Sequence, residues 1–414
     1  MKPTIIAMAL LLVSVVQNSS TANISQKLSR SHFQFSVDLF KALVHQDENS
    51  GTNLLFSPYS VNSVLSMLFL GTSSSSKSSE ELRAVLHYEN MSYVDVHNAF
   101  KEIVNVFDDN YYDKKVRSVN GLFVQDGVTI SSPYDRALRE FYHAKVEHID
   151  FRNADPSQTM GIVNDWINDV TEGQIPQLLN GPPSKDSKLL MVNAMALNAK
   201  WLNSFSPADT FNKGLYFLPG NQRLEIPMMS GRHTLPLGYS PEMECRILEI
   251  PFTQRRISMF VLLPDDTEGL NRLEANLTAD SLKLLFSTLK DEVVNVRLPR
   301  FRLESEVKIL DALENIGLSD IFNPQNSDLS LMAPYEQIHL SNIAHKSVLE
   351  VTENGAKGSS ATYASLERVG TFGQKYFEVD HPFIFLVWDY YSGMLLLMGR
   401  VIHPESIGDG AESK

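Results

Sequence analysis

The chain has 414 residues and a formal net charge of −13 at pH 7, with 36 lysines and arginines against 49 aspartates and glutamates. This acidic excess argues against nucleic acid and anionic membrane as partners, because both carry negative charge. Cys245 is the only cysteine, so no internal disulfide is possible. A chain of this length buries enough apolar surface to fold without one, and we interpret Cys245 as a structural thiol in a strand.

The N-terminus has the pattern of a secretory signal. Lys2 precedes an apolar run over residues 5–16, and Ser20 and Ala22 fit the small-x-small cleavage rule. The apolar run is shorter than the roughly 20 residues that a membrane-spanning helix needs. We therefore predict a signal peptide over residues 1–22 and a secreted, extracellular protein whose mature domain spans residues 23–414.

Two N-glycosylation sequons agree with an extracellular compartment. They are Asn90 in "NMS" and Asn276 in "NLT", and they predict a glycoprotein. A third tripeptide, "NIS" at Asn23, would begin the mature chain and is a poorer acceptor.

Helical patterns dominate the first half of the chain. Phe33, Val37 and Phe40 recur at helical spacing, and residues 59–71 are apolar on nearly every side, as in a buried helix. After the serine-rich run 72–79, Ser78 and Glu81 have the spacing of a capping box and predict a helix start. Residues 160–171 predict a further amphipathic helix.

The second half of the chain reads as strands. Long apolar or alternating runs cover residues 256–264, 292–305, 383–391 and 393–401, and the last two predict a hairpin that turns at Ser392-Gly393. No linker and no internal repeat divides the chain. Helices first and strands later favour a single domain of the α+β class.

A catalytic or metal site has no visible signature. The chain lacks the G-x-S-x-G, HExxH, G-x-x-x-x-G-K and GxGxxG patterns, and its histidines have no ligand spacing. Asp265 and Asp266 lie in a turn that follows a strand. We therefore expect no enzymatic activity, no metal and no cofactor.

The segment "TENGAKGSSATYASLERVG", residues 352–370, is unusual in composition. If it is extended, one face carries positions 356, 358, 360, 362, 364 and 366, which are uncharged and mostly small, whereas Lys357 and Glu367 lie on the other. The segment therefore suits both a mobile loop and a strand with one buried face. Composition and parity alone leave these two interpretations open.

The segments around it resemble the serpin family. "NLLFSPYSVNSVLSMLFLG" at 53–71, "VNGLFVQDGVTI", "VNDWINDVTEGQI", "LLMVNAMALNAKWLNSF", "FEVDHPFIFLV" at 377–387 and "LMGRVIHP" at 397–404 match family patterns in order over about 350 residues. The resemblance implies one domain with about nine helices, three β-sheets and an exposed reactive-centre loop over about residues 353–377.

The resemblance also implies roles for individual residues. The hinge and inserting segment would comprise Glu353, Gly355, Ala356, Gly358, Ser359, Ser360, Ala361 and Thr362. The sheet-opening cluster would comprise Ser57, Ser60, Asn193, His345 and Trp201, with Trp201 under the top of the sheet where the loop enters. The chain departs from the family pattern at Asn354, where an acid is usual, and at Lys357.

The mechanism implied is suicide inhibition of a serine protease. The protease would cleave the loop, and the cut loop would then insert into the central sheet. One hinge length places the cleaved bond at Arg368-Val369, which implies a trypsin-like target and is favoured; another places it at Val369-Gly370, which implies an elastase-like one.

The alternative function is that of a non-inhibitory serpin acting as a carrier, chaperone or storage protein. The expected partner of the inhibitor is a serine protease bound covalently, and we expect a monomer. The basic run at residues 114–117 is interpreted as solvated charge in preference to a sulfated-polysaccharide site.

Overall fold

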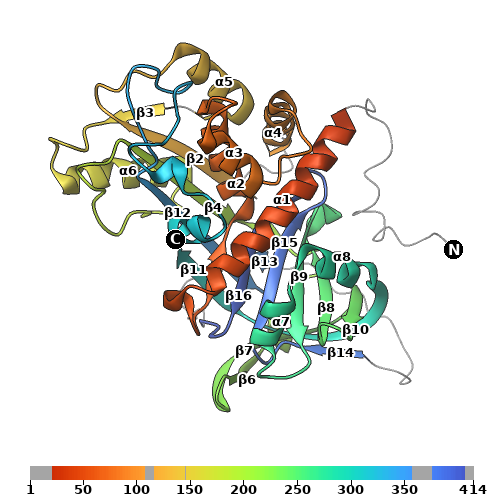
Figure 1. Cartoon of the computed structure of the whole chain (residues 1–414). Coiled ribbons are helices and arrows are strands. Elements are labelled where there is room, and N and C mark those ends of the chain that lie inside the picture. The colour runs from red at the N-terminus through yellow and green to blue at the C-terminus, as the bar shows by residue number, and fades with distance from the viewer. Residues whose placement is uncertain (1–20, 108–115, 145, 357–374, 406–414) are drawn as a thin grey trace.

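The computed structural model describes residues 21–107, 116–144, 146–356 and 375–405 (Figure 1). Over these ranges it contains nine α-helices: α1 (Thr21–Val44), α2 (Pro58–Gly71), α3 (Lys77–Val85), α4 (Tyr93–Phe107), α5 (Ser132–Tyr142), α6 (Pro156–Val170), α7 (Leu270–Asn276), α8 (Ala279–Ser287) and α9 (Ile309–Asn315).

Strands dominate the later part of the chain, as the pattern predicts, but they also alternate with the helices in the earlier part, which the pattern does not predict. They are β1 (Leu54–Phe56), β2 (Val116–Gln125), β3 (Val146–Ile149), β4 (Leu189–Leu197), β5 (Ala199–Lys200), β6 (Phe211–Leu218), β7 (Gln222–Ser240), β8 (Cys245–Pro251), β9 (Ile257–Pro264), β10 (Lys290–Pro299), β11 (Phe301–Glu306), β12 (Asn342–Thr352), β13 (Gly355–Ala356), β14 (Lys375–Glu378), β15 (Phe383–Asp389) and β16 (Met394–Val401).

Helix α2 forms for reasons that are visible in its sequence. Ser57 is its N-cap, where the Ser57 hydroxyl accepts a hydrogen bond from the Ser60 amide at 3.2 Å, and Pro58 supplies a preset φ in the first turn. All of its residues are buried, as the apolar pattern predicts.

Helix α3 begins earlier than the predicted capping box. Its N-cap is Ser76, whose hydroxyl accepts from the Ser79 amide at 3.1 Å. Ser78 lies inside the helix and donates to Asp320, while the Glu81 carboxylate accepts from the backbone amides of Ser319 and Asp320. The predicted box was wrong, because both side chains bind a distant segment instead of the helix end.

The larger sheet has nine strands in the order β1-β16-β15-β9-β8-β7-β10-β14, with β6 paired to β7. Strand β7 belongs to two parts of it. Its first part pairs with β6 and β10, and its last four residues pair with β8. Because β7 is continuous, it joins two of the three expected sheets into one hydrogen-bonded sheet. The described strands therefore form two sheets. The predicted hairpin is β15–β16.

The smaller sheet has seven strands in the order β3-β2-β4-β12-β13-β5, with β11 on β12. Strands β4 and β12 run parallel, from Asn342 opposite Leu190 to Val348 opposite Ala196. Beyond this parallel section, the short strand β13 lies between β12 and β5. We call the junction between β4 and β12 the seam. The two strands are paired directly along the parallel section, and beyond it β13 is paired with β12 in place of β4.

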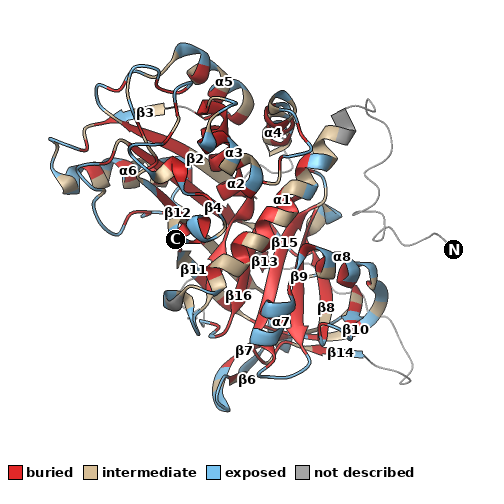
Figure 2. Ribbon diagram, viewed as in Figure 1, coloured by how far each residue is buried: buried red, intermediate tan, exposed pale blue. Residues whose placement is uncertain are grey.

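The described residues form two hydrophobic cores. Buried positions concentrate on the strands and on the inner sides of the helices (Figure 2). The larger core joins α1 and α2 to both sheets. The smaller one includes Val163 and Ile167 of α6 together with Val192 and Ala194 of β4. Helix α6 therefore covers part of the seven-stranded sheet.

Cys245 is a buried residue at the start of β8, as expected, and burial raises the pKa of its thiol to about 12. Within the described ranges, no helix has the length and apolarity of a membrane span. The same ranges hold no group of histidine, cysteine and acidic side chains that could bind a metal ion.

Candidate functional site

The hinge of the predicted loop lies at the end of β12. After Thr352 the chain turns through Glu353 and Asn354, and Gly355–Ala356 then forms β13. Gly355 pairs with Thr352 on one side and with Lys200 on the other. The first two residues after the turn therefore already form a strand inside the seven-stranded sheet.

Gly355 is the residue that makes this turn possible. Its φ is +138°, in a region that residues with a side chain rarely adopt. A Cβ atom at this position would meet the carbonyl oxygen of Ala199 and would lie 2.6 Å from the Lys200 Cα. Only glycine lets the backbones of β13 and β5 approach this closely.

Trp201 and Phe205 hold the turn against the sheet. The Trp201 indole N–H donates to the Thr352 carbonyl and its backbone N–H to the Asn354 carbonyl, both at 2.9 Å. The Phe205 amide donates to the Glu353 carbonyl at 2.9 Å. The buried Trp201 ring stacks on Phe252 with centroids 4.4 Å apart. The strand is therefore fixed at the position where a loop would enter.

The Glu353 side chain is buried and has two partners. The Thr210 hydroxyl donates to its Oε1 at 2.8 Å, and the Arg300 guanidinium approaches the same oxygen to 3.9 Å. A buried carboxylate needs such partners, because burying it unpaired costs several kcal/mol. Glu353 therefore anchors the hinge to the segment that leads into β6 and to the start of β11.

A buried polar cluster lies under the seam between β4 and β12. The Ser57 amide donates to His345 Nε2 at 3.0 Å, and His345 Nδ1 lies 2.8 Å from the Asn193 side-chain oxygen. The Asn193 amide group donates to Asn120, which donates to Ser63 Oγ at 3.2 Å. These bonds link helix α2 to both strands that flank the seam.

The charge state of His345 follows from its partners. Because Nε2 accepts from the Ser57 amide, the ring proton lies on Nδ1 and is donated to Asn193. Burial lowers the pKa of His345 to about 3, so the ring is neutral near pH 7. A neutral ring with its proton on Nδ1 matches the Asn193 oxygen on one side and the Ser57 amide on the other.

The structure brings together most, but not all, of the predicted cluster. Ser57, Asn193 and His345 are directly bonded, and Ser60 bonds Ser57 through its amide and lies 3.3 Å from Ser118 through its hydroxyl. Trp201 lies apart from them at the hinge, where it bonds Thr352, which follows His345 by seven residues on β12, or about 23 Å along the strand. His345 and Asn193 are paired in the middle of the parallel section, whereas Trp201 lies beyond its end.

Several residues of these sites are not predicted by the sequence, namely Ser63, Ser118, Asn120, Phe205, Thr210, Phe252, Arg300 and also Ser347, whose hydroxyl lies 3.2 Å from His345 Nε2. Asn120 is the clearest case, because it becomes a partner only when β2 pairs with β4 in the register that sets it opposite Asn193. Nothing in the sequence near Asn120 indicates that register.

Part of the predicted loop lies outside the described residues. This holds for Gly358, Ser359, Ser360, Ala361 and Thr362 of the inserting segment, and for Arg368, Val369 and Gly370 at the predicted reactive bond. The predicted signal peptide, except for its last two residues, also lies outside them.

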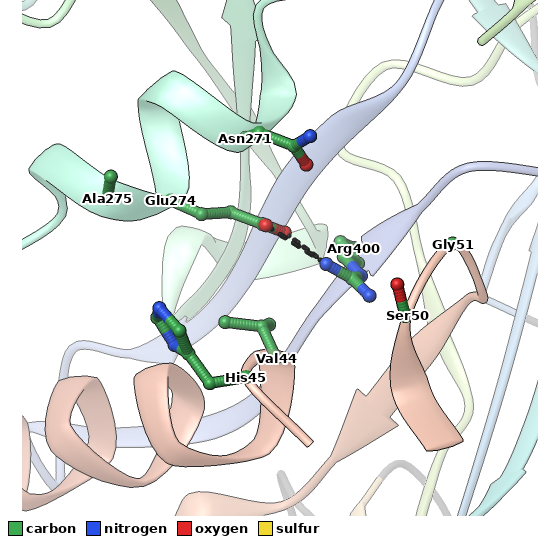
Figure 3. Close-up of a pocket in the computed structure, with 8 residues that line it drawn as sticks. All are labelled: Val44, His45, Ser50, Gly51, Asn271, Glu274, Ala275 and Arg400. Carbon is green, nitrogen blue, oxygen red and sulfur yellow. Dashed lines mark hydrogen bonds and ion pairs between the residues drawn. The ribbon is translucent and has the colours of Figure 1, made fainter. Parts of the chain in front are cut away.

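A separate cavity of about 210 Å³ lies between the end of α1, helix α7 and strand β16 (Figure 3). Arg400 and Glu274 form a buried ion pair at its wall, with 2.8 Å between Arg400 Nη1 and Glu274 Oε1. Burial raises the pKa of the Glu274 carboxyl group, and the nearby Arg400 charge partly offsets this effect. Arg400 also donates to the carbonyls of Thr52 and Asn49. The pair ties α7 to β16 and belongs to no predicted site.

The comparisons with known proteins point to one family. A family model described as "Serpin (serine protease inhibitor)" matches residues 30–404. The leukocyte elastase inhibitor of Xenopus laevis is 31% identical over 387 residues, which cover 92% of this chain and 100% of that protein. The human leukocyte elastase inhibitor is also 31% identical, over 389 residues with the same coverage.

Solved structures agree over nearly the whole chain. The crystal structure of maspin matches with a TM-score of 0.83 at 28% identity, covering 92% of this chain and 100% of that one. Serpin48 from the insect Tenebrio molitor matches with a TM-score of 0.79 at 26% identity, covering 91% and 98%. This chain has the α+β fold of those proteins, and it belongs to the serpin family.

Proposed function

We propose that this protein is a secreted inhibitor that traps serine proteases as a suicide substrate. The observation that carries the proposal is the hinge: β13 is already paired on both sides, between β12 and β5. The protease serine attacks the reactive bond, forms an ester with the loop and releases the new amino terminus. Insertion of the cut loop along the seam then displaces the bound protease before the ester is hydrolysed.

The free energy of insertion is large enough for this work. A dozen residues added between β4 and β12 would form on the order of ten new hydrogen bonds, at ~0.5–1.5 kcal/mol net each. The sum is on the order of 10 kcal/mol, comparable to the ~5–15 kcal/mol stability of a typical protein. Within residues 356–366, the even-numbered positions would face inward in the inserted strand, and none of them is charged. Insertion would therefore bury no charged side chain.

Two bonds compete as the reactive bond. Cleavage at Arg368-Val369 would select a trypsin-like protease, because an acid in a protease pocket pairs with arginine. Cleavage at Val369-Gly370 would select an elastase-like one, and the names of the leukocyte elastase inhibitors favour testing it. We favour Arg368 as the residue on the acyl side.

Secretion is supported by the predicted signal peptide and by the sequons. Asn90 and Asn276 are both exposed, Asn90 in a turn after α3 and Asn276 at the end of α7. Both side chains are therefore accessible to glycosylation. Protein recovered from the medium of expressing eukaryotic cells is expected to begin at Asn23 and is the material for the following test.

The test is incubation with trypsin and, separately, with pancreatic elastase, followed by denaturing gels. We expect a covalent complex that survives denaturation, and a released C-terminal fragment that begins at Val369 with trypsin. Arg368→Ala should abolish the trypsin complex and spare any elastase complex. Plain cleavage without a complex would overturn the proposal and favour the non-inhibitory alternative of a carrier, chaperone or storage protein.

A further inference from the structure

The hinge contains an asparagine followed by a glycine. Such a pair can lose ammonia without an enzyme, because glycine has no Cβ atom to hinder attack of its backbone nitrogen on the asparagine side chain. The chain has three of these pairs, Asn120-Gly121, Asn180-Gly181 and Asn354-Gly355. The three share the same chemistry, so any difference in their reactivity reports how the fold restrains each one.

The pair Asn120-Gly121 is held inside a sheet. Both residues belong to β2, where Asn120 is opposite Asn193 and Gly121 is opposite Val192 of β4. The Asn120 side chain is bonded at both of its ends, because it accepts from Asn193 and donates to Ser63. A reaction at this pair would require β2 to separate from β4.

The pair Asn180-Gly181 is much less restrained. Both residues are exposed in the connection between α6 and β4, outside any helix or strand. A Cβ atom at Gly181 would meet nothing within 4 Å. The Asn180 side chain donates to Glu306 at the surface. This pair therefore provides a reference for an accessible site in the same molecule.

The pair Asn354-Gly355 is held by contacts of the hinge. The Trp201 backbone N–H donates to the Asn354 carbonyl at 2.9 Å, and Gly355 is paired with Thr352 and Lys200. The half-buried Asn354 side chain has no hydrogen-bond partner among the described residues. Because β13 is only two residues long, the departure of this short strand from the sheet would release the pair.

We propose that Asn354-Gly355 is a deamidation site and that the pairing of β13 protects it. In the reaction the Gly355 nitrogen loses its proton and bonds to Asn354 Cγ, while the C–N bond of the side-chain amide breaks and ammonia leaves. Water then opens the cyclic imide at either carbonyl, which gives aspartate or isoaspartate at position 354.

The structure couples ring closure to opening of the hinge. The Asn354 carbonyl oxygen and the Gly355 nitrogen lie in one rigid peptide plane. Ring closure needs a ψ angle at Asn354 outside the main allowed regions, so this plane has to rotate before the nitrogen reaches Cγ. The same rotation moves the carbonyl away from the Trp201 N–H and removes Gly355 from its place between β12 and β5.

The reaction would alter the hinge permanently. Isoaspartate continues the chain through its side-chain carbon and adds one backbone atom before Gly355. Gly355 has no room for such a shift, since even a Cβ atom there would lie 2.6 Å from the Lys200 Cα. Aspartate would place a second carboxylate beside that of buried Glu353, and like charges repel. The isoaspartate product is therefore expected to stay out of the sheet.

Peptide mapping of the full-length protein, aged at neutral pH, tests the proposal. Trypsin digestion places the three pairs in separate peptides, residues 118–136, 153–185 and 347–357. Mass spectrometry then follows the replacement of amide by carboxylate in each peptide. The same protein unfolded in urea gives the intrinsic rate of each pair.

The three pairs should differ in the folded protein. We expect Asn180 to react within about threefold of its unfolded rate and Asn354 at least about tenfold more slowly than its own, because only opened molecules react. Asn120 should show no detectable reaction. An Asn354 that reacts at its unfolded rate, or one that is as inert as Asn120, would overturn the proposal.

Two variants loosen the hinge in different ways. Trp201→Phe removes the indole bond to the Thr352 carbonyl and keeps an aromatic ring against Phe252, and Thr210→Val removes the hydroxyl that donates to Glu353. In each we expect deamidation at Asn354 to accelerate at least about threefold while Asn180 stays unchanged. Continued inertness of Asn120 shows that the sheet is intact. Unchanged rates at Asn354 in both variants would contradict protection by β13.

A further measurement rests on the proposed function. After aged protein is incubated with trypsin, isoaspartate at position 354 should be enriched in the cleaved band and depleted from the covalent complex. Equal content in the two bands would overturn the effect on the hinge. Failure to form any complex would overturn the proposed function instead, and the deamidation rates measured without a protease would stand.

Discussion

At the scale of single residues, Gly355 decides whether the hinge can form. Its positive φ and its contact with the backbone of β5 leave no space for a Cβ atom. A Cβ atom here would collide with the backbone of Ala199 and Lys200, which is paired with β13 and cannot swing aside as a flexible side chain could. Gly355 is therefore the hinge residue that tolerates a side chain least.

We predict that Gly355→Ala converts the inhibitor into a substrate. The added Cβ would collide with β5, so β13 would leave the sheet and insertion would start more slowly than ester hydrolysis. The measurement is the number of inhibitor molecules consumed per protease inactivated, which should rise several-fold.

Gly181→Ala is the matched control for this substitution, because a Cβ atom there would meet nothing within 4 Å. It should leave the stoichiometry unchanged. An unchanged stoichiometry for Gly355→Ala as well would mean that pairing of β13 plays no part in trapping.

At the scale of elements, the proposed mechanism requires the sheet to open at the seam between β4 and β12. Seven directly paired positions join these strands, and the His345 cluster links both to α2. Helix α6 packs against the same region, where Val163 and Ile167 meet Ala194 and Ala196 in the smaller core. On the proposed mechanism, insertion would break the pairing between β4 and β12, and α6 would have to move with the sheet to keep this core.

A disulfide across the seam should abolish trapping. Ala196 and Val348 are directly opposite in the parallel pair, a separation compatible with a disulfide. In the oxidised Ala196→Cys, Val348→Cys protein, we expect cleavage of the loop without a covalent complex, because the new strand cannot enter.

Adding a reductant should restore the complex, and each single cysteine variant should inhibit normally under both conditions. A complex formed in the fully oxidised protein would contradict insertion between β4 and β12. If the protein is not an inhibitor, wild type and all of the cysteine variants should fail to form a covalent complex under both conditions.

At the scale of the whole molecule, three buried histidines link stability to pH. His32 in α1, His97 in α4 and His345 in β12 have pKa values lowered to about 4, about 3 and about 3, in each case chiefly because burial disfavours the charged ring. Their unfolded forms titrate near pH 6.5. Below that pH the unfolded chain binds more protons than the folded one.

We therefore predict that stability is full above about pH 6.5 and falls as the pH decreases toward 4. Each histidine contributes a slope of about 1.4 kcal/mol per pH unit over the part of that window where only the unfolded form is protonated. Buried Glu249 and Glu274, whose pKa values burial raises, act in the opposite direction at acid pH.

Urea unfolding followed by circular dichroism at pH 7.5, 6.0 and 5.0 measures the net effect. His345→Asn isolates one contribution, because its dependence on pH should be shallower than that of wild type by about one proton. An identical dependence would show that His345 is not held neutral in the folded protein.

The sequence by itself determined the class of fold, the helices α1, α2 and α6 and the β15–β16 hairpin. These follow from local physics, since apolar periodicity and turn residues act over a few residues. The family motifs add the hinge residues and a sheet-opening cluster of Ser57, Ser60, Asn193, His345 and Trp201. The roles of both sets stay predictions.

Only the tertiary structure decided which residues complete these sites. Asn120 faces Asn193 through strand register, Phe205 and Thr210 reach Glu353 through the path of the chain toward β6, and Ser78 leaves its own helix to bind Asp320. The separation of Trp201 from His345 along β12 is also a property of the folded sheet. Each depends on contacts between segments far apart in sequence, and local patterns carry no information about such pairings.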